Sequence, residues 1–198
     1  MAWQDHAKSA LRTFIENITN MTPTDKQWEE FCSHLKSKKF EKGESYAEQG
    51  EQCVYLSYIY KGLFAFSISD SEGNESIKSF NWDDYFVASY SSFITGEPSN
   101  FRIFAYEDSH VLMIDSSSLT KLFDKEMIWQ KLGRLNAEGA YVRKEKRESE
   151  LLIMDAEERY QSFLNSHKDI HERISGKDIA AYLGINPATL SRLKKKMS

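Results

Sequence analysis

The spacing of hydrophobic residues changes twice along this chain, and each change predicts a different kind of element. Near the N-terminus apolar side chains recur at intervals of three and four, at Trp28, Phe31 and Leu35. Thr24 precedes Gln27 by three residues, which is the spacing of a capping box. The pattern predicts an amphipathic helix that begins just after Thr24 and packs through its apolar face.

Short runs of aromatic and β-branched residues replace this pattern between residues 40 and 115. Turn residues separate the runs at spacings of roughly ten, and glycines mark several turns: Gly43, Gly50, Gly62 and Gly73. Short strands at such regular spacing are typical of an antiparallel sandwich or barrel. We therefore expect the middle of the chain to form an all-β domain.

A heptad stripe follows residue 119, where the turn signals stop and no proline occurs up to residue 154. The stripe is apolar in its first half and mixed in its second, and its members are Ile128, Leu132, Leu135, Gly139, Val142, Lys146, Ser149 and Ile153. We expect a long helix over residues 120–154 that pairs in parallel with its twin in a second chain. Packing of this helix against its own chain is the alternative. The predicted dimer contacts are Ile128, Leu132, Leu135, Gly139 and Val142.

Signals for helix ends become dense after this stripe. Asp155 and Glu158 have the spacing of a capping box and predict a new helix. Ser175 and Asp178 repeat that spacing. Gly184 then supplies the positive φ that ends a helix abruptly.

A second helix is predicted directly after this turn. Asn186 can cap it, and Pro187 stands at its first position, where a missing amide proton costs nothing. Two helices joined by so short a turn form a helix-turn-helix. Their shared apolar seam is expected to contain Ala180, Leu183, Ile185, Leu190 and Leu193.

Positive charge is concentrated in this last segment. The chain has 26 basic and 30 acidic residues and a net charge of -4, so any attraction to nucleic acid must be local. Residues 173–198 contain six basic residues and one acidic residue. A small basic module on an acidic body is typical of a nucleic-acid-binding protein. A lysine-rich end that only complements a helix dipole is the alternative interpretation.

The outer face of the predicted second helix suits a DNA major groove. Arg192 can make a bidentate contact to guanine, and hydroxyl side chains can bond to phosphates or base edges. The lysines at 194–196 can neutralise phosphates. The predicted DNA-binding residues are Lys177, Asn186, Ala188, Thr189, Ser191, Arg192, Lys195 and Lys196.

Other chemistries find little support in the sequence. The two cysteines, Cys32 and Cys53, are too few for a disulfide framework or a four-cysteine cluster. His167 and His171 have no third ligand nearby, and the signatures GxSxG and HExxH are missing. No apolar run approaches the roughly 18 residues of a membrane span, and no signal core precedes residue 24. We expect a cytoplasmic protein that is not an enzyme, has no metal, cofactor or membrane partner, and acts by binding.

The order of β-sandwich, long helix and helix-turn-helix resembles the cyclic-AMP receptor protein and fumarate-nitrate regulator (Crp/Fnr) family of bacterial transcription factors. The resemblance covers nearly the whole chain and is carried by FEKGESYAEQGE, YIYKGLFAFS, TGEPSNFRIFAYEDSHVLMID, AEERYQSFL and ISGKDIAAYLGINPATLSRLKKK. It implies an α+β fold in three parts. These are a jelly-roll sensor domain of the cyclic-nucleotide-binding type with N-terminal helices (1–119), a dimerisation helix (120–154) and a winged-helix-like helix-turn-helix domain (155–198).

The resemblance also implies a function. Family members bind palindromic double-stranded DNA operators as homodimers and regulate transcription, with RNA polymerase as a further partner. Arg192 falls where the family places its main base-reading arginine, whereas Pro187 and Ala188 replace an arginine and a glutamate of the cyclic-AMP receptor protein. The target sequence of that protein is therefore not expected here. A ligand-binding or protein-interaction module with a vestigial helix-turn-helix is the alternative function.

The predicted sensor pocket departs from the nucleotide-binding members. Their Gly-Glu-Leu and Arg-Ser-Ala segments correspond here to Ala-Ser-Tyr (88–90) and Ser-Asn-Phe (99–101). A buried cyclic phosphate would lack its charge-assisted partner, so we expect weak or no cyclic-AMP binding. The protein is then either active without a ligand or responds to an unknown small-molecule effector. The degenerate pocket is assigned to Ser89, Tyr90, Ser99 and Asn100.

Overall fold

The computed structural model describes residues 2–70, 72, 73 and 75–197. The chain divides into two compact units. We call residues 1–66 with 80–138 the sandwich unit, and residues 67–79 with 139–198 the helical unit. The division falls within the long helix α5 (Met127–Ile153), so each unit contains one part of that helix.

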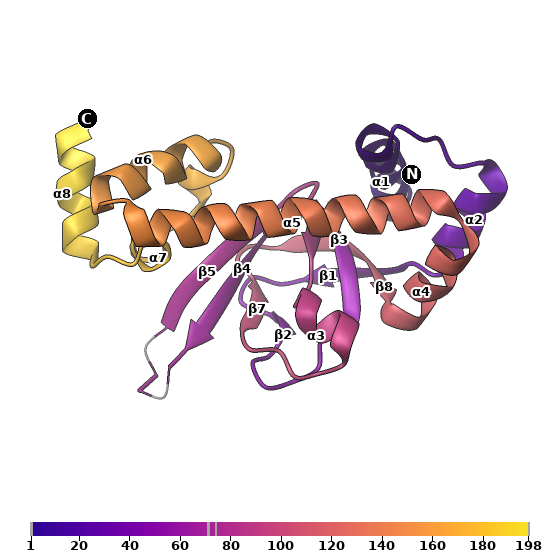
Figure 1. The fold of residues 1–198 in the computed structure, drawn as a ribbon, viewed down its shortest axis with the longest axis horizontal. Coiled ribbons are helices and arrows are strands. Elements are labelled where there is room, and N and C mark those ends of the chain that lie inside the picture. Colours follow the sequence, from indigo (N-terminus) through magenta and orange to yellow (C-terminus); the bar gives the residue numbers. More distant parts are fainter. Residues whose placement is uncertain (1, 71, 74, 198) are drawn as a thin grey trace. The chain divides into compact units, whose positions relative to one another are not determined.

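Eight strands form two four-stranded sheets, with strand orders β1-β8-β3-β6 and β2-β7-β4-β5 (Figure 1). The strands are β1 Lys36–Phe40, β2 Ser45–Ala47, β3 Tyr55–Lys61, β4 Leu63–Ser69, β5 Glu75–Trp82, β6 Phe86–Val87, β7 Arg102–Ala105 and β8 Ser109–Asp115. The strand pairs β1–β8 and β3–β8 are antiparallel. The turn spacing predicted an antiparallel sandwich or barrel, and the two sheets form a sandwich.

Glycine is required at the tight connection between β3 and β4. Gly62 has a φ of 129°, a value that other residues rarely adopt. A Cβ atom placed there would lie 2.0 Å from Ser109 Oγ on the neighbouring strand β8. The close approach of these two backbones therefore depends on the absence of a side chain at this position.

The interior between the sheets is filled mainly by aromatic and branched side chains. Its buried members are Phe40, Ile59, Phe64, Phe66, Val87, Ile103, Ala105, Val111 and Met113. Phe64 makes edge-on contacts with the rings of Phe40 and Tyr46, at centroid distances of 5.6 and 5.8 Å. This geometry is a favoured one for aromatic pairs.

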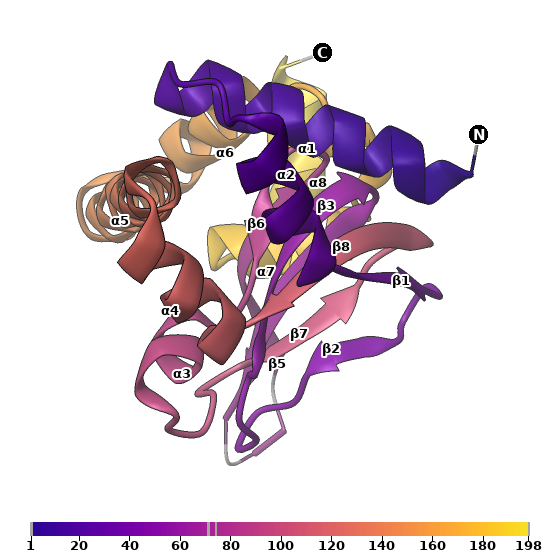
Figure 2. The same ribbon diagram turned by 90° about the vertical axis from the view of Figure 1, so that its right-hand side faces the viewer.

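Four helices complete the sandwich unit before α5: α1 Trp3–Thr19, α2 Asp25–Ser33, α3 Tyr90–Thr95 and α4 Ser116–Lys125. Helix α1 packs on strands β3 and β8, and Figure 2 shows it running across them. Thr24 caps α2 in the predicted capping box, with its hydroxyl accepting from the Gln27 amide and its own amide donating to the Gln27 side chain. The amphipathic helix expected after Thr24 is confirmed.

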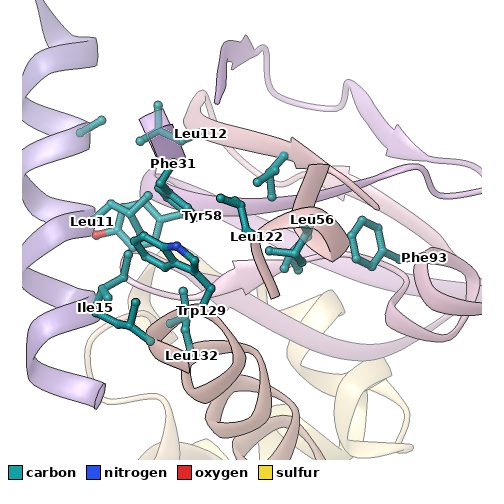
Figure 3. Close-up of a cluster of buried hydrophobic side chains, with 14 residues drawn as sticks. Leu11, Ile15, Phe31, Leu56, Tyr58, Phe93, Leu112, Leu122, Trp129 and Leu132 are labelled. Atoms are coloured by element: carbon teal, nitrogen blue, oxygen red, sulfur yellow. The ribbon is translucent and has the colours of Figure 1, made fainter. Parts of the chain in front are cut away.

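The first part of α5 is buried in a second core of the same unit (Figure 3). Trp129 stacks on Phe31 of α2 with ring centroids 4.5 Å apart, and the two residues flank further apolar side chains from α1 and β3. Ile128 and Leu132 belong to this core and are almost fully buried. Two of the five predicted dimer contacts are therefore already packed inside their own chain, as the alternative interpretation of the stripe expected.

Residues 116–153 form two helices, whereas the sequence pattern predicted one over 120–154. Asp115 caps α4 by accepting hydrogen bonds from the Ser118 amide and from the hydroxyls of Ser117 and Ser118. Glu126 has an extended backbone, with φ -137° and ψ 129°, and separates α4 from α5. An N-terminal cap and one extended residue thus place the start of the long helix at Met127.

The helical unit continues after α5 with α6 Ala156–Ser166, the short 3-10 helix η1 His171–Arg173, α7 Gly176–Leu183 and α8 Pro187–Met197. The predicted capping box of Asp155 and Glu158 starts α6. Within the described residues 139–197 every regular element is a helix, so strands of a wing are not found in that range.

Candidate nucleic-acid interface and sensor pocket

Helix α7 begins and ends where the sequence signals predicted. Ser175 Oγ accepts a hydrogen bond from the Asp178 amide at 3.1 Å, which satisfies a donor of the first turn. Gly184 has a φ of 66°, and its amide donates back to the carbonyls of Ala180 and Ala181. This left-handed residue ends the helix and turns the chain toward α8.

Helix α8 starts three residues later with its own cap. Asn186 Oδ1 accepts from the Thr189 amide at 2.8 Å, and Pro187 occupies the first helical position. The carbonyl oxygen of the Asn186 side chain, which the sequence assigned to DNA binding, is thus engaged in capping. Only its amino group remains to contact another partner.

The two helices share an apolar seam. Ala180, Leu183 and Leu190 are buried, while Ile185 and Leu193 are half-buried. The seam predicted from the sequence is therefore confirmed in its buried members. It fixes which face of α8 is turned outward.

The outward face of α8 carries most of the predicted DNA-binding residues. Ala188, Ser191, Arg192 and Lys195 are exposed and follow one another at helical spacing, and Thr189 beside them is half-buried. Arg192 Nη2 donates to Thr189 Oγ1 at 3.1 Å, so the guanidinium is held along the helix surface. Lys177 is exposed in the first turn of α7.

Lys196, which was also predicted to bind DNA, instead forms an ion pair with Glu157. Its Nζ donates to Glu157 Oε2 of α6 at 2.5 Å, and this hydrogen bond raises the pKa of Lys196. The sequence analysis missed Glu157 because it lies 39 residues from Lys196 and no local pattern links the two. Lys196, which the sequence predicted to neutralise a DNA phosphate, therefore has an acidic neighbour within its own unit.

Two of the four predicted sensor-pocket residues lie together. Ser89 is 1% exposed and Ser99 is 2% exposed, and Ser99 Oγ donates to Ser89 Oγ at 2.8 Å. Tyr90 instead packs against the core that contains Trp129, and Asn100 is exposed. The two serines that the family resemblance aligned with a glutamate and an arginine of nucleotide-binding members are thus joined by a neutral, buried hydrogen bond.

A buried cysteine contacts Ser89, and the Tyr46 hydroxyl shares the Tyr55 carbonyl with that cysteine. The Tyr46 hydroxyl lies 2.8 Å from both the Tyr55 carbonyl and Ser57 Oγ, and burial raises its pKa. The Ser89 amide donates to Cys53 Sγ at 3.4 Å, and burial raises the pKa of that thiol. Tyr46 and Cys53 therefore stay neutral near pH 7 and offer no charge to a ligand.

Arg102, the arginine nearest to the pocket in sequence, is directed elsewhere. Its Nε lies 3.5 Å from Glu48 Oε2, and its Nη2 donates to the Gly43 carbonyl at 3.2 Å. Among the described residues, no group of three or more histidine, cysteine, aspartate or glutamate side chains is arranged to hold a metal ion. In the same part of the chain, every helix is too short or too polar to cross a membrane.

Residues 37–126 match the family described as cyclic nucleotide-binding domain. FixK2 from Bradyrhizobium japonicum has a similar structure, with a TM-score of 0.71, 22% identity and coverage of 82% of this chain and 84% of its own. The global regulator CLP from Xanthomonas campestris, whose structure is described as c-di-GMP responsive, gives a TM-score of 0.70 at 16% identity and covers 88% and 91%.

A transcriptional regulator of the Crp/Fnr family from Eubacterium rectale gives the same TM-score and identity, with coverage of 88% of this chain and 83% of its own. Comparison with curated protein sequences gave no match. Residues 37–126 thus match the cyclic nucleotide-binding domain family, and the chain has the fold of the Crp/Fnr regulators.

Proposed function

We propose that this protein is a sequence-specific, DNA-binding transcription regulator whose helix α8 enters the major groove. One observation carries the proposal: a capped and rigidly turned helix pair presents an exposed face with Ala188, Ser191, Arg192 and Lys195. In a helix-turn-helix the first residues of the second helix meet the base edges. The fold shared with Crp/Fnr regulators supports the same function.

The chemistry of this face favours guanine. Arg192 is exposed, and its fork of donors matches the O6 and N7 acceptors of guanine in the major groove. The methyl group of Ala188 suits the methyl group of thymine. The exposed lysines at 194 and 195 can contact phosphates, so the affinity should fall steeply with rising salt.

A homodimer is part of this proposal. The second half of α5 exposes apolar side chains, with Val142 63% and Ile153 77% exposed. These two residues are eleven positions apart, close to three full turns, and lie on one side of the helix. Pairing of two such helices would place two copies of α8 on half-sites about 34–36 Å apart in a palindromic operator.

The sensor domain is proposed to work without cyclic AMP. Ser89 and Ser99, which the resemblance assigns to the nucleotide pocket, are neutral and bonded to each other, and a buried anion without a partner is strongly disfavoured. The regulator is then active without a ligand or responds to an uncharged effector. Contacts with RNA polymerase remain an expectation from the family.

Selection of bound sequences from a random duplex pool tests this function. The wild type, with no added ligand, is expected to enrich one palindrome. Arg192→Ala should fail to enrich it, whereas Lys168→Ala, which removes an exposed cation elsewhere in the helical unit, should enrich it normally. Failure of the wild type to enrich any sequence, even with cyclic nucleotides and cell extract added, would contradict the proposal.

A further inference from the structure

The carbonyl end of α7 is held by two arginines from other helices of the helical unit. Arg147 of α5 donates through Nη2 to the Tyr182 carbonyl. Arg159 of α6 donates through Nε to the Leu183 carbonyl at 3.0 Å, and through Nη1 to the Met154 carbonyl at the end of α5 at 2.7 Å. The last carbonyls of a helix lack partners within the helix and carry the negative end of its dipole. Two guanidinium groups therefore satisfy them at this end.

Arg147 also contacts the side chain of Tyr182, the residue whose carbonyl it binds. Its guanidinium carbon lies 4.0 Å from the centroid of the Tyr182 ring, within the range of a cation–π contact. Tyr182 is only 8% exposed and packs against the rings of Phe163 and His167, at 5.3 and 5.4 Å. One side chain of α5 thus fixes both the backbone and the ring of the last turn of α7.

Burying the Arg147 guanidinium in this arrangement also lowers the stability of the folded unit. Burial lowers the pKa of Arg147, which means that the charged group loses hydration. Its Nη1 is buried and has no hydrogen-bond partner among the described residues. An unpaired buried donor destabilises the folded state, which offsets much of what the two contacts contribute. The geometry therefore points to a role beyond holding the unit together.

The end of α7 determines where α8 starts. Only residues 184–186 separate the two helices. The Ile185 amide donates to the Ala180 carbonyl at 3.0 Å, and Asn186 caps α8, so the connection has little freedom. A shift of the last turn of α7 would be passed on to the direction of α8.

We propose that Arg147 and Arg159 are positioning residues for DNA recognition, which hold the carbonyl end of α7 and thereby set the direction in which α8 presents Arg192. The inference rests on the proposed function, and it adds that sequence reading depends on two side chains that do not touch DNA. A base-reading contact tolerates little displacement, since the donors must meet fixed acceptors. Phosphate contacts made by flexible lysine side chains tolerate a larger displacement of the helix.

The experiment compares the full-length variants Arg147→Met, Arg147→Lys and Arg159→Met with Lys144→Met. Lys144 is an exposed lysine of the same helix, paired with Glu148, so its loss changes the charge equally. Binding to the selected operator and to a random duplex of equal length is measured at one salt concentration. Arg147→Met and Arg159→Met should weaken operator binding about tenfold and random-duplex binding less than about twofold, because only specific binding depends on base contacts. Lys144→Met should change both by less than about twofold.

Arg147→Lys is included because Arg147→Met could lose DNA binding simply by unfolding. It keeps the charge but loses the planar fork, so it should lose operator preference while its random-duplex affinity stays that of the wild type. Equal losses on both duplexes, or no loss on either, would overturn the inference. So would a loss of operator preference in Lys144→Met as large as that in Arg147→Met.

Amide hydrogen exchange separates this inference from the proposed function. Arg147→Met should speed exchange of the Gly184 and Ile185 amides, because their helix end is released, and Lys144→Met should not. If the wild type itself does not distinguish operator from random duplex, the proposed function has failed. Unchanged exchange at these two amides in Arg147→Met would overturn the positioning role whatever the DNA result.

Discussion

The family resemblance assigns binding roles to the face of α8 and to the Ser89–Ser99 pair, but these two sites have opposite physical character. Arg192 and Lys195 are exposed and charged, whereas Ser89 and Ser99 are buried, neutral and bonded to each other. A group that binds a partner must remain available to it, and a group that satisfies a neighbour in the core is already engaged. The contrast supports a binding surface on α8, as proposed, and a packed interior at the serine pair.

Removal of the lysines at the end of α8 should have the largest effect. The triple variant Lys194→Ala, Lys195→Ala and Lys196→Ala should lower DNA affinity by orders of magnitude at low salt. Each lost phosphate contact reduces the slope of log K against log salt by about 0.9. The fall in slope then gives the number of these lysines that contact phosphates, and the ion pair of Lys196 with Glu157 should reduce the contribution of that lysine. Fluorescence anisotropy over a salt series measures both quantities.

A matched triple variant controls for net charge. Lys39, Lys42 and Lys61 are exposed lysines of the sandwich unit, and their replacement by alanine removes the same charge. This control should leave the slope unchanged. Retention of regulatory function by the α8 variant would support a ligand-binding or protein-interaction module with a vestigial helix-turn-helix, and the contrast between the two regions would disappear.

The serine pair should show the reverse behaviour, with an effect on stability and none on DNA binding. Ser99→Ala leaves the buried Ser89 hydroxyl without this partner, and the free energy of unfolding should fall by about 1–2 kcal/mol. Ser91→Ala, at an exposed serine of α3, should stay within about 0.5 kcal/mol of the wild type. Urea unfolding measures the changes, and operator affinity should equal that of the wild type in both variants.

The double variant Ser89→Ala, Ser99→Ala sharpens this test. If the two hydroxyls serve mainly each other, the double variant should lose less stability than the sum of the single variants. Additive losses would mean that the hydroxyls do not interact. A rise in stability upon addition of cyclic AMP to the wild type would contradict the neutral-core interpretation, since ligand binding to the native state stabilises it.

The sequence predicted those features that depend on near neighbours in the chain. Capping at Thr24, Asp155 and Asn186 requires only residues three positions apart, and the structure confirms each cap. Gly184 was predicted to end α7 for a similar reason, because its conformation is local. The regular spacing of turns was sufficient to predict an all-β domain with a sandwich or barrel architecture, since strand length and turn residues are local features.

Contacts between distant residues could not be predicted in this way. The heptad stripe fits a dimer and a core equally well, and only the fold shows that Ile128 and Leu132 pack beneath α1 and α2. Arg147 and Arg159 reach carbonyl groups 35 and 24 residues away, and Arg147 has no sequence neighbour that marks it as buried. From the sequence alone, a polar residue on a helix is predicted to be exposed, because its tertiary partner is not known.

A fall in pH should reduce the stability of the helical unit before that of the sandwich unit, and this effect should be smaller than those of the variants above. His167 is buried in the helical unit, its Nδ1 donates to the Phe163 carbonyl, and its ring stacks on Phe163. Burial, as the largest cause, lowers its pKa, and the nearby cations Arg147 and Lys146 add to this, while the Phe163 carbonyl and Glu150 oppose it. A histidine with a lowered pKa in the folded state contributes stability above its unfolded pKa of about 6.5, and this contribution is lost as the pH falls.

In the sandwich unit the corresponding titration lies far lower. Hydrogen bonds from the Ser118 amide, first, and from the Ser117 hydroxyl lower the pKa of Asp115 to about 2. The stability that this cap contributes is therefore complete above about pH 4 and is lost as the pH falls toward about 2. Between pH 7.5 and 5.5 the amides of α6 and α7 should lose protection from hydrogen exchange, while those of α4 should keep it. His167→Gln should abolish this pH dependence, because glutamine does not titrate. Equal loss of protection in both units, or a pH dependence that survives in His167→Gln, would show that another group controls the acid response.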